Sequence, residues 1–193
     1  AVTMDGENLY FYGPYSHVGC LDARTGKLVW TNNDPQTREL VQEEGRGLSS
    51  TPGFRTEPFS LVARDALFFA PQTNQYVAAV SKDDGRLLWY RRKTTSNPNL
   101  LYADDSILVG VGEAGNTLRL DPLTGETKQD LGFRKRSCSR LTATPDSFFC
   151  RGFFEGTTRY DRKSGKVTFN GAMRPSCQDG VVPANGLLFI GPW

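Results

Sequence analysis

The stretch Leu21-Asp22-Ala23-Arg24-Thr25-Gly26-Lys27-Leu28-Val29-Trp30 decides the fold, because an Asp, a polar run and a Gly separate two apolar strands in it. The Asp side chain bonds back to the backbone, and the Gly takes the positive φ that closes a tight hairpin. Three further segments have the same form: 80–89 (VSKDDGRLLW), 120–126 (LDPLTGE) and 160–167 (YDRKSGKV). The turn glycines lie at 26, 85, 125 and 165. We therefore expect four related hairpins.

Each of these turns closes a larger unit of short strands. An apolar strand begins 18 or 19 residues before each turn glycine; these strands are 8–12, 66–70, 106–110 and 147–151, and a fifth copy is 186–190. A polar turn precedes each strand, and another short strand precedes most of those turns. A period near 40 residues without helical periodicity is typical of a β-propeller, in which four-stranded sheets repeat around an axis. An irregular β-sandwich with coincidental turns is the alternative.

We therefore expect an all-β protein, a single propeller segment of four-stranded antiparallel blades over residues 1–193. The blades are expected near 1–32, 57–93, 97–131 and 138–171, with the start of a further blade at 177–193 and an insertion at 33–56. These four and a half blades form an arc or part of a larger ring, since propellers have about 4–8 blades. We expect the intact protein to continue beyond Trp193, so that further blades of the same chain cover the open sheet faces.

The composition supports a packed core and excludes two classes of partner. Of 193 residues, 38% are hydrophobic, and the aromatic residues are 12 Phe, 7 Tyr and 3 Trp. The chain has 23 Lys and Arg and 21 Asp and Glu, and its net charge of +2 gives no electrostatic field that would hold a nucleic acid. No apolar run approaches the roughly 20 residues of a membrane-spanning helix. We therefore predict neither nucleic-acid binding nor a membrane span.

The turn copies resemble the repeat of the pyrroloquinoline-quinone (PQQ)-like family, also called quinoprotein alcohol dehydrogenase-like. In that repeat a strand ending in Leu-Asp is followed by a Thr-Gly-Lys turn and a strand closing in Trp, as in residues 21–30. Trp30 and Trp89 stand at the closing position, whereas the third and fourth copies have Gln129 and Phe169 there. The resemblance implies that Trp30, Trp89 and Phe169 pack between adjacent blades.

The resemblance leaves the chemistry open, because the repeat serves both enzymes and extracytoplasmic scaffolds. The quinoprotein alcohol dehydrogenases hold PQQ and calcium on the propeller axis, beside a disulfide of two adjacent cysteines. The cysteines of this chain stand at 20, 138, 150 and 177, so it has no adjacent pair. We expect a non-catalytic, periplasmic or extracellular binding module of a bacterial protein, without cofactor or metal. Part of a PQQ-dependent dehydrogenase, with PQQ and calcium held by further blades, is the alternative.

Cys138 and Cys177 are the most informative cysteines. Each lies nine residues before the second strand of its blade, so the two occupy the same place in consecutive repeats. That place is on or just before the innermost strand, and the two side chains should face each other near the axis. A disulfide, which needs Cα atoms about 4.4–6.8 Å apart, two free thiols, and a metal or redox site all remain open. Cys20 and Cys150 are expected to be buried like small hydrophobic residues.

A basic cluster surrounds this pair, formed by Arg134, Lys135, Arg136, Arg140 and, one repeat later, Arg174. Arginines at a channel mouth bind a carboxylate or phosphate through bidentate hydrogen bonds, so the expected partner is a protein or a small anionic ligand on the propeller face. The candidate ligand-binding residues are Arg134, Arg136, Arg140, Arg174, Gln178 and Asp179. A solvated loop without a ligand is the alternative.

The insertion and the polar turns complete the set of candidates. The insertion is polar, is expected to decorate one face of the propeller, and contains a candidate amphipathic helix near residues 37–44. The single histidine, His17, lies in a Gly/Pro-rich connection and is expected to be an exposed loop residue. The Asp pairs at 83–84 and 104–105 are expected to form turns rather than to bind calcium.

Overall fold

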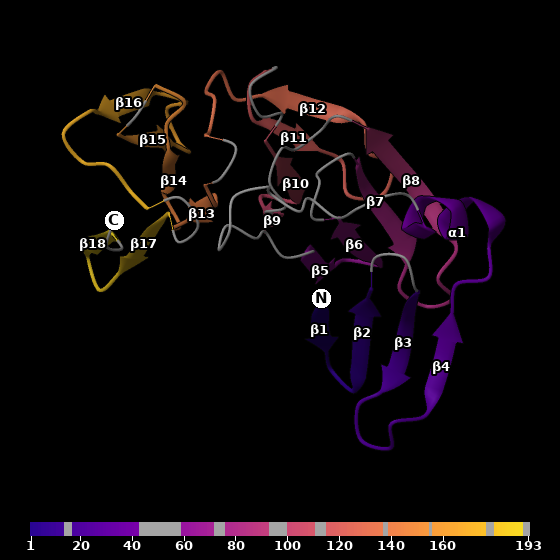
Figure 1. Ribbon diagram of the computed structural model, residues 1–193. Coiled ribbons are helices and arrows are strands. Elements are labelled where there is room, and N and C mark those ends of the chain that lie inside the picture. The colour runs from indigo at the N-terminus through magenta and orange to yellow at the C-terminus, as the bar shows by residue number, and fades with distance from the viewer. Residues whose placement is uncertain are drawn as a thin grey trace, which may run out of the picture.

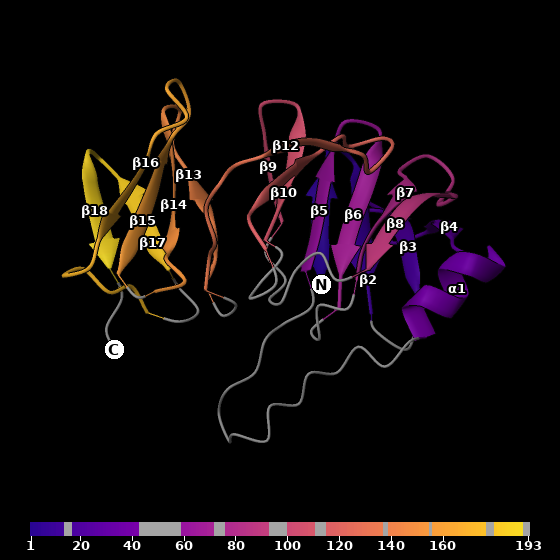
Figure 2. The same ribbon diagram turned by 90° about the horizontal axis from the view of Figure 1, so that it is seen from above.

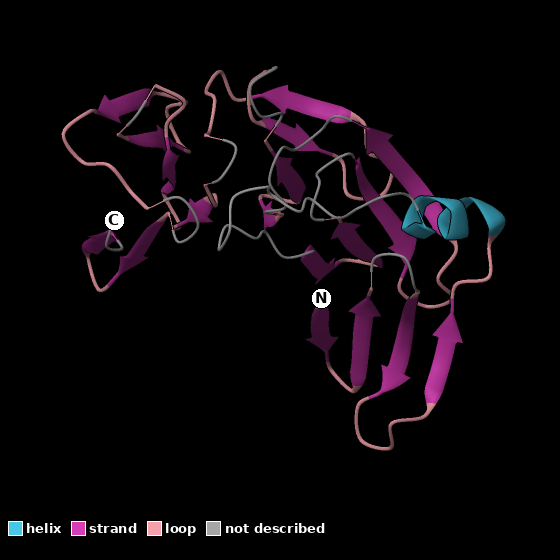
Figure 3. Ribbon diagram, in the orientation of Figure 1, coloured by secondary structure: helices cyan, strands magenta, loops and turns pink. Residues whose placement is uncertain are grey.

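The computed structural model describes residues 1–13, 17–42, 59–71, 76–92, 100–110, 115–136, 139–154, 156–176 and 180–190. These residues form four antiparallel four-stranded sheets, a two-stranded hairpin and one short helix (Figure 3). The predicted all-β class and the four-stranded blades are therefore confirmed.

The strands follow one another outward in every sheet, in chain order. Sheet 1 contains β1 (Val2–Asp5), β2 (Asn8–Tyr12), β3 (Val18–Asp22) and β4 (Leu28–Thr31). Sheet 2 contains β5 (Phe59–Ala63), β6 (Ala66–Ala70), β7 (Tyr76–Ser81) and β8 (Leu87–Arg92). Sheet 3 contains β9 (Leu101–Ala103), β10 (Ser106–Val109), β11 (Leu118–Leu120) and β12 (Thr127–Asp130). Sheet 4 contains β13 (Thr142–Ala143), β14 (Ser147–Arg151), β15 (Thr157–Asp161) and β16 (Val167–Asn170), and the hairpin that follows it contains β17 (Val181–Ala184) and β18 (Leu187–Ile190).

The sheets are arranged around an arc, with the first strand of each sheet on the inner side (Figures 1 and 2). The first strands of neighbouring units lie side by side: β1 contacts β5, β9 contacts β13, and β13 contacts β17. Tight turns join the first to the second strand and the third to the fourth, so they share one face of the arc. The longer connections, between second and third strands and between sheets, share the opposite face. We call these the turn face and the loop face.

The tight turns have the chemistry expected from the sequence. Gly26, Gly85, Gly125 and Gly165 have φ values of 70°, 74°, 72° and 70°. In the first copy the carboxylate of Asp22 accepts a hydrogen bond of 2.6 Å from the backbone N–H of Thr25. Glycine adopts this φ at little cost, and the aspartate, or Ser81 in the second copy, accepts hydrogen bonds from free backbone donors of the turn, so the local sequence favours each turn.

Apolar side chains fill the gaps between consecutive sheets, and strand β6 shows how. All five of its residues are buried, because both of its faces are covered. Leu67 and Phe69 pack in a cluster with Tyr10 of sheet 1, whereas Phe68 on the other face packs in a cluster with Ile107 of sheet 3. A third cluster joins sheets 3 and 4. Stacking against its neighbours therefore buries what a single sheet leaves exposed.

The two ends of the arc leave apolar side chains in solvent. Val2 and Met4 of β1 are each 65% exposed, and Leu187 and Phe189 of β18 are 61% and 51% exposed. The described residues show no apolar cluster between sheet 4 and the β17–β18 hairpin that compares with the other three. These faces have the apolar character of a gap between blades, which is why their exposure is a liability for association.

The insertion begins with helix α1 (Pro35–Gln42), two residues before the expected helix. Asp34 caps it, because the carboxylate accepts hydrogen bonds from the backbone N–H and the hydroxyl of Thr37, at 3.1 and 3.0 Å. Leu40 and Val41 pack into the core between sheets 1 and 2. The rest of the insertion, from residue 43 to residue 58, lies outside the described residues.

One irregularity distinguishes the fourth sheet from the other three. In sheets 1 to 3 the pairing of the third and fourth strands shifts by one residue at a β-bulge, which pairs Trp30 with Cys20 and Trp89 with Ala79. In sheet 4 the pairing is continuous, and Phe169 pairs with Thr158. Since a shift of one residue turns a side chain to the other face, Phe169 faces back toward sheet 3. It does not occupy the docking place that its spacing predicts.

Candidate functional site

Trp30 and Trp89 lie at equivalent junctions between sheets. Each indole Nε1 donates a 2.9 Å hydrogen bond to a carbonyl of the next sheet's outer turn, Lys82 for Trp30 and Pro122 for Trp89. Both side chains are 8% exposed. A Cβ added to Gly125 would stand 2.6 Å from the Trp89 ring, so this glycine is needed for close approach as well as for its positive φ. These residues have a structural role in joining the sheets.

The junction between sheets 3 and 4 uses charge instead of tryptophan. Asp104, in the inner turn of sheet 3, accepts a hydrogen bond of 2.6 Å from Arg119 and a second one from Arg162 in the outer turn of sheet 4. Both guanidinium groups lie over the Phe148 ring, with centroid distances of 5.7 and 5.1 Å. The hydrogen bond from Arg162 lowers the pKa of the Asp104 carboxyl below its ordinary value. The sequence does carry a signal for this network, because Arg119 stands on a strand where the first two copies have the small residues Cys20 and Ala79.

The basic cluster lies at the loop face of sheet 4, and two of its arginines share one aromatic ring. The guanidinium carbons of Arg134 and Arg136 lie 5.7 and 6.0 Å from the centre of the Phe153 ring. Backbone hydrogen bonds fix the segment to the sheet: Arg136 N–H donates to the Arg151 carbonyl at 2.9 Å, and Phe153 N–H donates to the Arg134 carbonyl at 3.2 Å. Within the described ranges neither Arg134 nor Arg136 forms an ion pair with a carboxylate. Arg134 is exposed, whereas Arg136 is half-buried and its guanidinium donates a hydrogen bond of 3.4 Å to the Phe153 carbonyl, so both charges are held in a fixed frame.

Lys135, between those two arginines, differs from the expectation of an exposed basic group. Its side chain is 1% exposed, and Nζ donates a 2.8 Å hydrogen bond to the carbonyl of Ser139. The stem of the lysine lies against Gly110 of the loop after β10, where an added Cβ would stand 2.8 Å from the lysine Cδ. Strand alternation accounts for the burial, because consecutive residues of this extended segment point to opposite sides. The alternation of an extended segment over residues 134–136 is the sequence signal that predicts a buried Lys135 between two more exposed arginines.

The other candidate ligand-binding residues are only partly described. Arg140 is exposed, and Arg174, one repeat later, is half-buried. Gln178, Asp179, Cys138 and Cys177 lie outside the described residues, and the pairing of the two cysteines stays a prediction. Cys20 and Cys150 are buried free thiols, and burial raises the pKa of Cys150 to about 12. These two thiols are therefore packing groups rather than nucleophiles.

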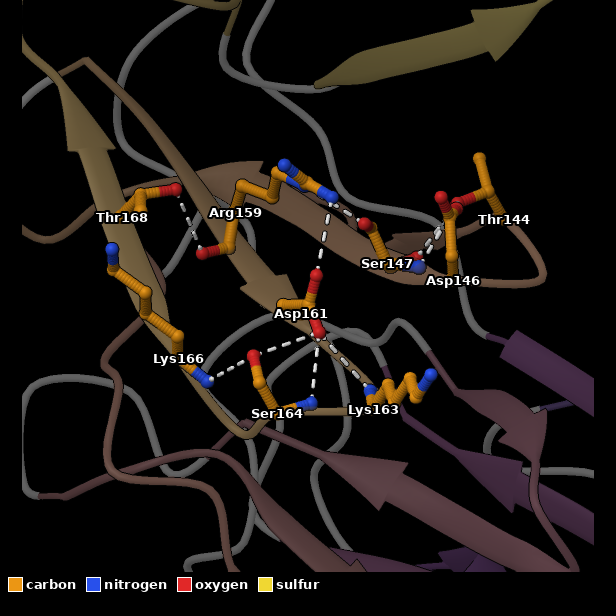
Figure 4. Close-up of polar contacts among 9 residues, drawn as sticks. All are labelled: Thr144, Asp146, Ser147, Arg159, Asp161, Lys163, Ser164, Lys166 and Thr168. Atoms are coloured by element: carbon orange, nitrogen blue, oxygen red, sulfur yellow. Dashed lines mark hydrogen bonds and ion pairs between the residues drawn. The ribbon is translucent and has the colours of Figure 1, made fainter.

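The turn face of sheet 4 carries a second polar network, drawn in Figure 4. Arg159 of β15 donates a 2.8 Å hydrogen bond from Nε to the Ser147 hydroxyl and lies 3.3 Å from the Asp161 carboxylate. Asp161 also accepts a 2.8 Å hydrogen bond from the backbone N–H of Ser164, which lowers the pKa of its carboxyl. A cavity of about 440 Å³ lies between Arg159 with its neighbours and the apolar Leu188 of β18. The network fixes the conformation of the turn and forms part of one wall of this cavity.

The single histidine and the acidic turn of sheet 3 have the positions that the sequence predicts. His17 is exposed, and it lines a cavity of about 220 Å³ with the residues of α1. Asp104 and Asp105 have φ values of 50° and 51°, so they form the inner turn of sheet 3 as expected. Among the described residues no three His, Cys, Asp or Glu side chains are grouped to hold a metal ion. No described helix is both long and apolar enough to cross a membrane.

Radially arranged four-stranded sheets with inter-sheet tryptophans define a partial β-propeller of PQQ-like repeats. The family model described as "Outer membrane protein assembly factor BamB" matches residues 1–190. The chain therefore belongs to this family of PQQ-like repeat proteins, as the sequence resemblance predicted.

Two curated proteins with a similar sequence are dehydrogenases. The chain is 25% identical over 172 residues to the quinoprotein ethanol dehydrogenase of Pseudomonas aeruginosa, and 24% identical over 159 residues to that of Pseudomonas putida. These matches cover 87% and 81% of this chain. The chain spans only 25% and 23% of the two relatives' own lengths.

Solved structures support the fold. BamB from Moraxella catarrhalis superposes with a TM-score of 0.54 at 15% identity, over 90% of this chain and 48% of that one. The designed protein Ika8 gives a TM-score of 0.65 at 11% identity, over 98% of this chain and 54% of that one. Sqt1 from Saccharomyces cerevisiae gives 0.60 at 11% identity, over 90% and 46%. At these identities the likeness shows the architecture alone.

Within the described residues, the structure groups no three His, Cys, Asp or Glu side chains for the calcium ion that the PQQ-like resemblance implies. Calcium takes several oxygen ligands. The chain has no two adjacent cysteines, and the described thiols, Cys20 and Cys150, lie in different sheets. We therefore assign no step of quinone chemistry to these residues.

Proposed function

We propose that this chain is a binding module of a periplasmic or extracellular bacterial protein, and that it holds a protein partner at the loop face of sheet 4. One observation carries this proposal: Arg134 and Arg136 are fixed over the Phe153 ring, and neither meets a carboxylate within the described ranges. Arginines held this way keep their charge and lose little conformational freedom on binding.

The chemistry of the cluster identifies the kind of segment it would bind. Arg134, Arg136 and Arg140 present guanidinium groups, which pair with carboxylates in bidentate fashion. The net charge of the chain is only +2, so this local concentration rather than a global field would select the partner. An acidic loop or strand of a partner protein therefore fits this surface better than a nucleic acid, whose backbone needs a long basic track.

Site-specific photo-crosslinking in the native host tests this proposal. A photoreactive amino acid at position 140, at the loop face, is expected to yield a crosslink to one defined protein, and the same residue at position 24, in a turn of sheet 1, is not. Arg134→Gln combined with Arg136→Gln should abolish the crosslink while the protein stays folded. Equal crosslinking from positions 140 and 24, or a crosslink that survives both substitutions, would contradict the proposal.

A second candidate function rests on the matches to the two quinoprotein ethanol dehydrogenases. In that case the chain would be part of a PQQ-dependent oxidoreductase, with the cofactor ligands supplied outside the described residues. Incubation of the full-length protein with PQQ and calcium separates the two candidates. We expect no bound chromophore and no dye-linked ethanol oxidation, whereas stoichiometric uptake with activity would establish the enzyme.

A further inference from the structure

A cavity of about 320 Å³ lies on the side of sheet 4 that faces sheet 3. Its walls include Phe133, Arg134, Phe153, Phe154, Val167 and Phe169, which we call the aromatic cleft. The volume is at the lower end of the range for small-molecule sites, roughly 300–1,000 Å³. The cleft therefore has room for one compact ligand.

The cleft owes one of its aromatic walls to the missing bulge of sheet 4. Without the bulge, Phe169 pairs with Thr158 and turns toward sheet 3, together with Val167, which pairs with Tyr160. In sheets 1 and 2 the bulge turns the corresponding tryptophan to the next sheet, where it is buried. The register of a single strand pair thus converts a residue that joins sheets into a wall of an open cavity.

Three of the apolar side chains that line the cleft are exposed to solvent, although large apolar side chains are usually buried. Phe154 is 79% exposed, Phe169 is 54% exposed and Val167 is 40% exposed. Phe153 and Phe154 meet edge to face with their ring centres 5.0 Å apart, so each supports the position of the other. Exposed apolar side chains gathered around a cavity mark a binding site more often than scattered single ones do.

One cation completes the cleft. Arg134 lines it, is exposed, and lies with its guanidinium carbon 5.7 Å from the centre of the Phe153 ring. The carboxylate of Asp130 accepts hydrogen bonds from two residues that line the cleft, the Asn116 amide at 3.2 Å and the Gly132 N–H at 2.8 Å. The aromatic cleft therefore combines ring faces with one positive charge that no carboxylate of the described residues neutralises.

We propose that the aromatic cleft binds a small planar aromatic carboxylate. The ring of the ligand packs on the exposed faces of Phe154 and Phe169, and its carboxylate accepts bidentate hydrogen bonds from Arg134. An aliphatic acid of the same size lacks the ring stacking, and a neutral aromatic amide lacks the charge pair. The cleft shares Arg134 and Phe153 with the proposed protein contact, whereas Arg136 and Arg140 do not line the cleft.

Titration of the full chain with 2-naphthoate, followed by ligand fluorescence and calorimetry, tests this proposal. We expect saturable one-to-one binding with a Kd below about 1 mM, in line with the affinity per atom of small ligands. The neutral isostere 2-naphthamide should bind about 10-fold more weakly, because it cannot form the charged hydrogen bonds. No saturation below about 1 mM, or equal binding of acid and amide, would overturn the proposal.

Substitutions with matched controls locate the bound probe. Phe154→Ser and Phe169→Ser should each weaken 2-naphthoate binding about 10-fold, whereas Leu123→Ser, an exposed apolar residue of a turn in sheet 3, should not change it. Arg134→Gln should remove the preference for acid over amide, and Arg24→Gln should retain it. Circular dichroism shows whether each variant is folded. Binding that persists in Phe154→Ser but is lost in Arg140→Gln would place the anion on the basic cluster and refute the cleft.

Discussion

Gly125→Ala tests the idea that the turn glycines serve two purposes, the positive φ of the turn and close contact with the tryptophan of the preceding sheet. Gly125 has a φ of 72°, and an added Cβ would stand 2.6 Å from the Trp89 ring. Gly26 has nearly the same φ, 70°, but nothing lies within 4 Å of its added Cβ. The two glycines therefore form a matched pair that differs only in the contact.

The expected losses of unfolding free energy follow from the positive φ and from the contact with the Trp89 ring. A left-handed conformation costs an alanine about 1–2 kcal/mol, which is the whole expected loss of unfolding free energy for Gly26→Ala. Gly125→Ala should cost about 1–3 kcal/mol more, because the Trp89 ring must move out of a packed site. In a Trp89→Ala background the steric part disappears, so Gly125→Ala should again cost about 1–2 kcal/mol. Trp89→Ala alone should cost about 3–5 kcal/mol, as truncation of a buried aromatic residue does.

Urea unfolding followed by tryptophan fluorescence and circular dichroism measures all four variants. The expected double-mutant coupling between positions 89 and 125 is about 1–3 kcal/mol, in the sense that the double variant is more stable than the sum of the single losses predicts. Equal losses for Gly26→Ala and Gly125→Ala would refute the close-contact argument. An unchanged cost of Gly125→Ala without the tryptophan would refute it as well.

Three further predictions concern sheets 3 and 4. Asp104→Asn should lower the unfolding free energy by about 1 kcal/mol near pH 7. Because Arg162 lowers the folded-state pKa of Asp104, the stability from this carboxylate is present above its unfolded pKa of about 3.9 and is lost as the pH falls through the folded-state pKa. The thermal stabilities of wild type and variant should therefore converge at acid pH. Gly110→Ala should cost about 1–3 kcal/mol in thermal unfolding, since its Cβ would press on the Lys135 stem, and Lys135→Ala should relieve most of that cost. Cys150, with a pKa raised to about 12 by burial, should resist iodoacetamide at about pH 8 in the folded protein and react after denaturation, as peptide mass mapping would show; modification in the native state would contradict its burial.

The sequence predicted those parts of the structure that depend on local chemistry. An aspartate or, in the second copy, a serine, followed by a polar run and a glycine, specifies each outer turn within a few residues, and four such turns along the chain are enough to predict a propeller. The helix of the insertion was also predicted, two residues late, because its capping residue Asp34 precedes the expected start. In each case the determining contacts are between residues close in the chain.

Phe169 shows why the candidate site was harder to predict than the fold. The interval from the turn glycine to the closing residue is four residues in the copies ending at Trp30, Trp89 and Phe169, so spacing alone assigns all three the same role. The difference lies in a bulge, which changes the pairing of two strands without changing the length of either.

Lys135 was misplaced for a related reason. The run Arg134-Lys135-Arg136 predicts one exposed basic cluster. In the structure, however, the lysine stem occupies the space left by Gly110, 25 residues earlier in the chain. Such a space exists only once neighbouring sheets have stacked, so it is a property of the packed repeats rather than of any one repeat. The residues that distinguish this arc from others of its family should therefore be sought where one copy breaks the register of the rest. In the described part of this chain, that place is sheet 4, which has the basic cluster at its loop face and the aromatic cleft on its side toward sheet 3.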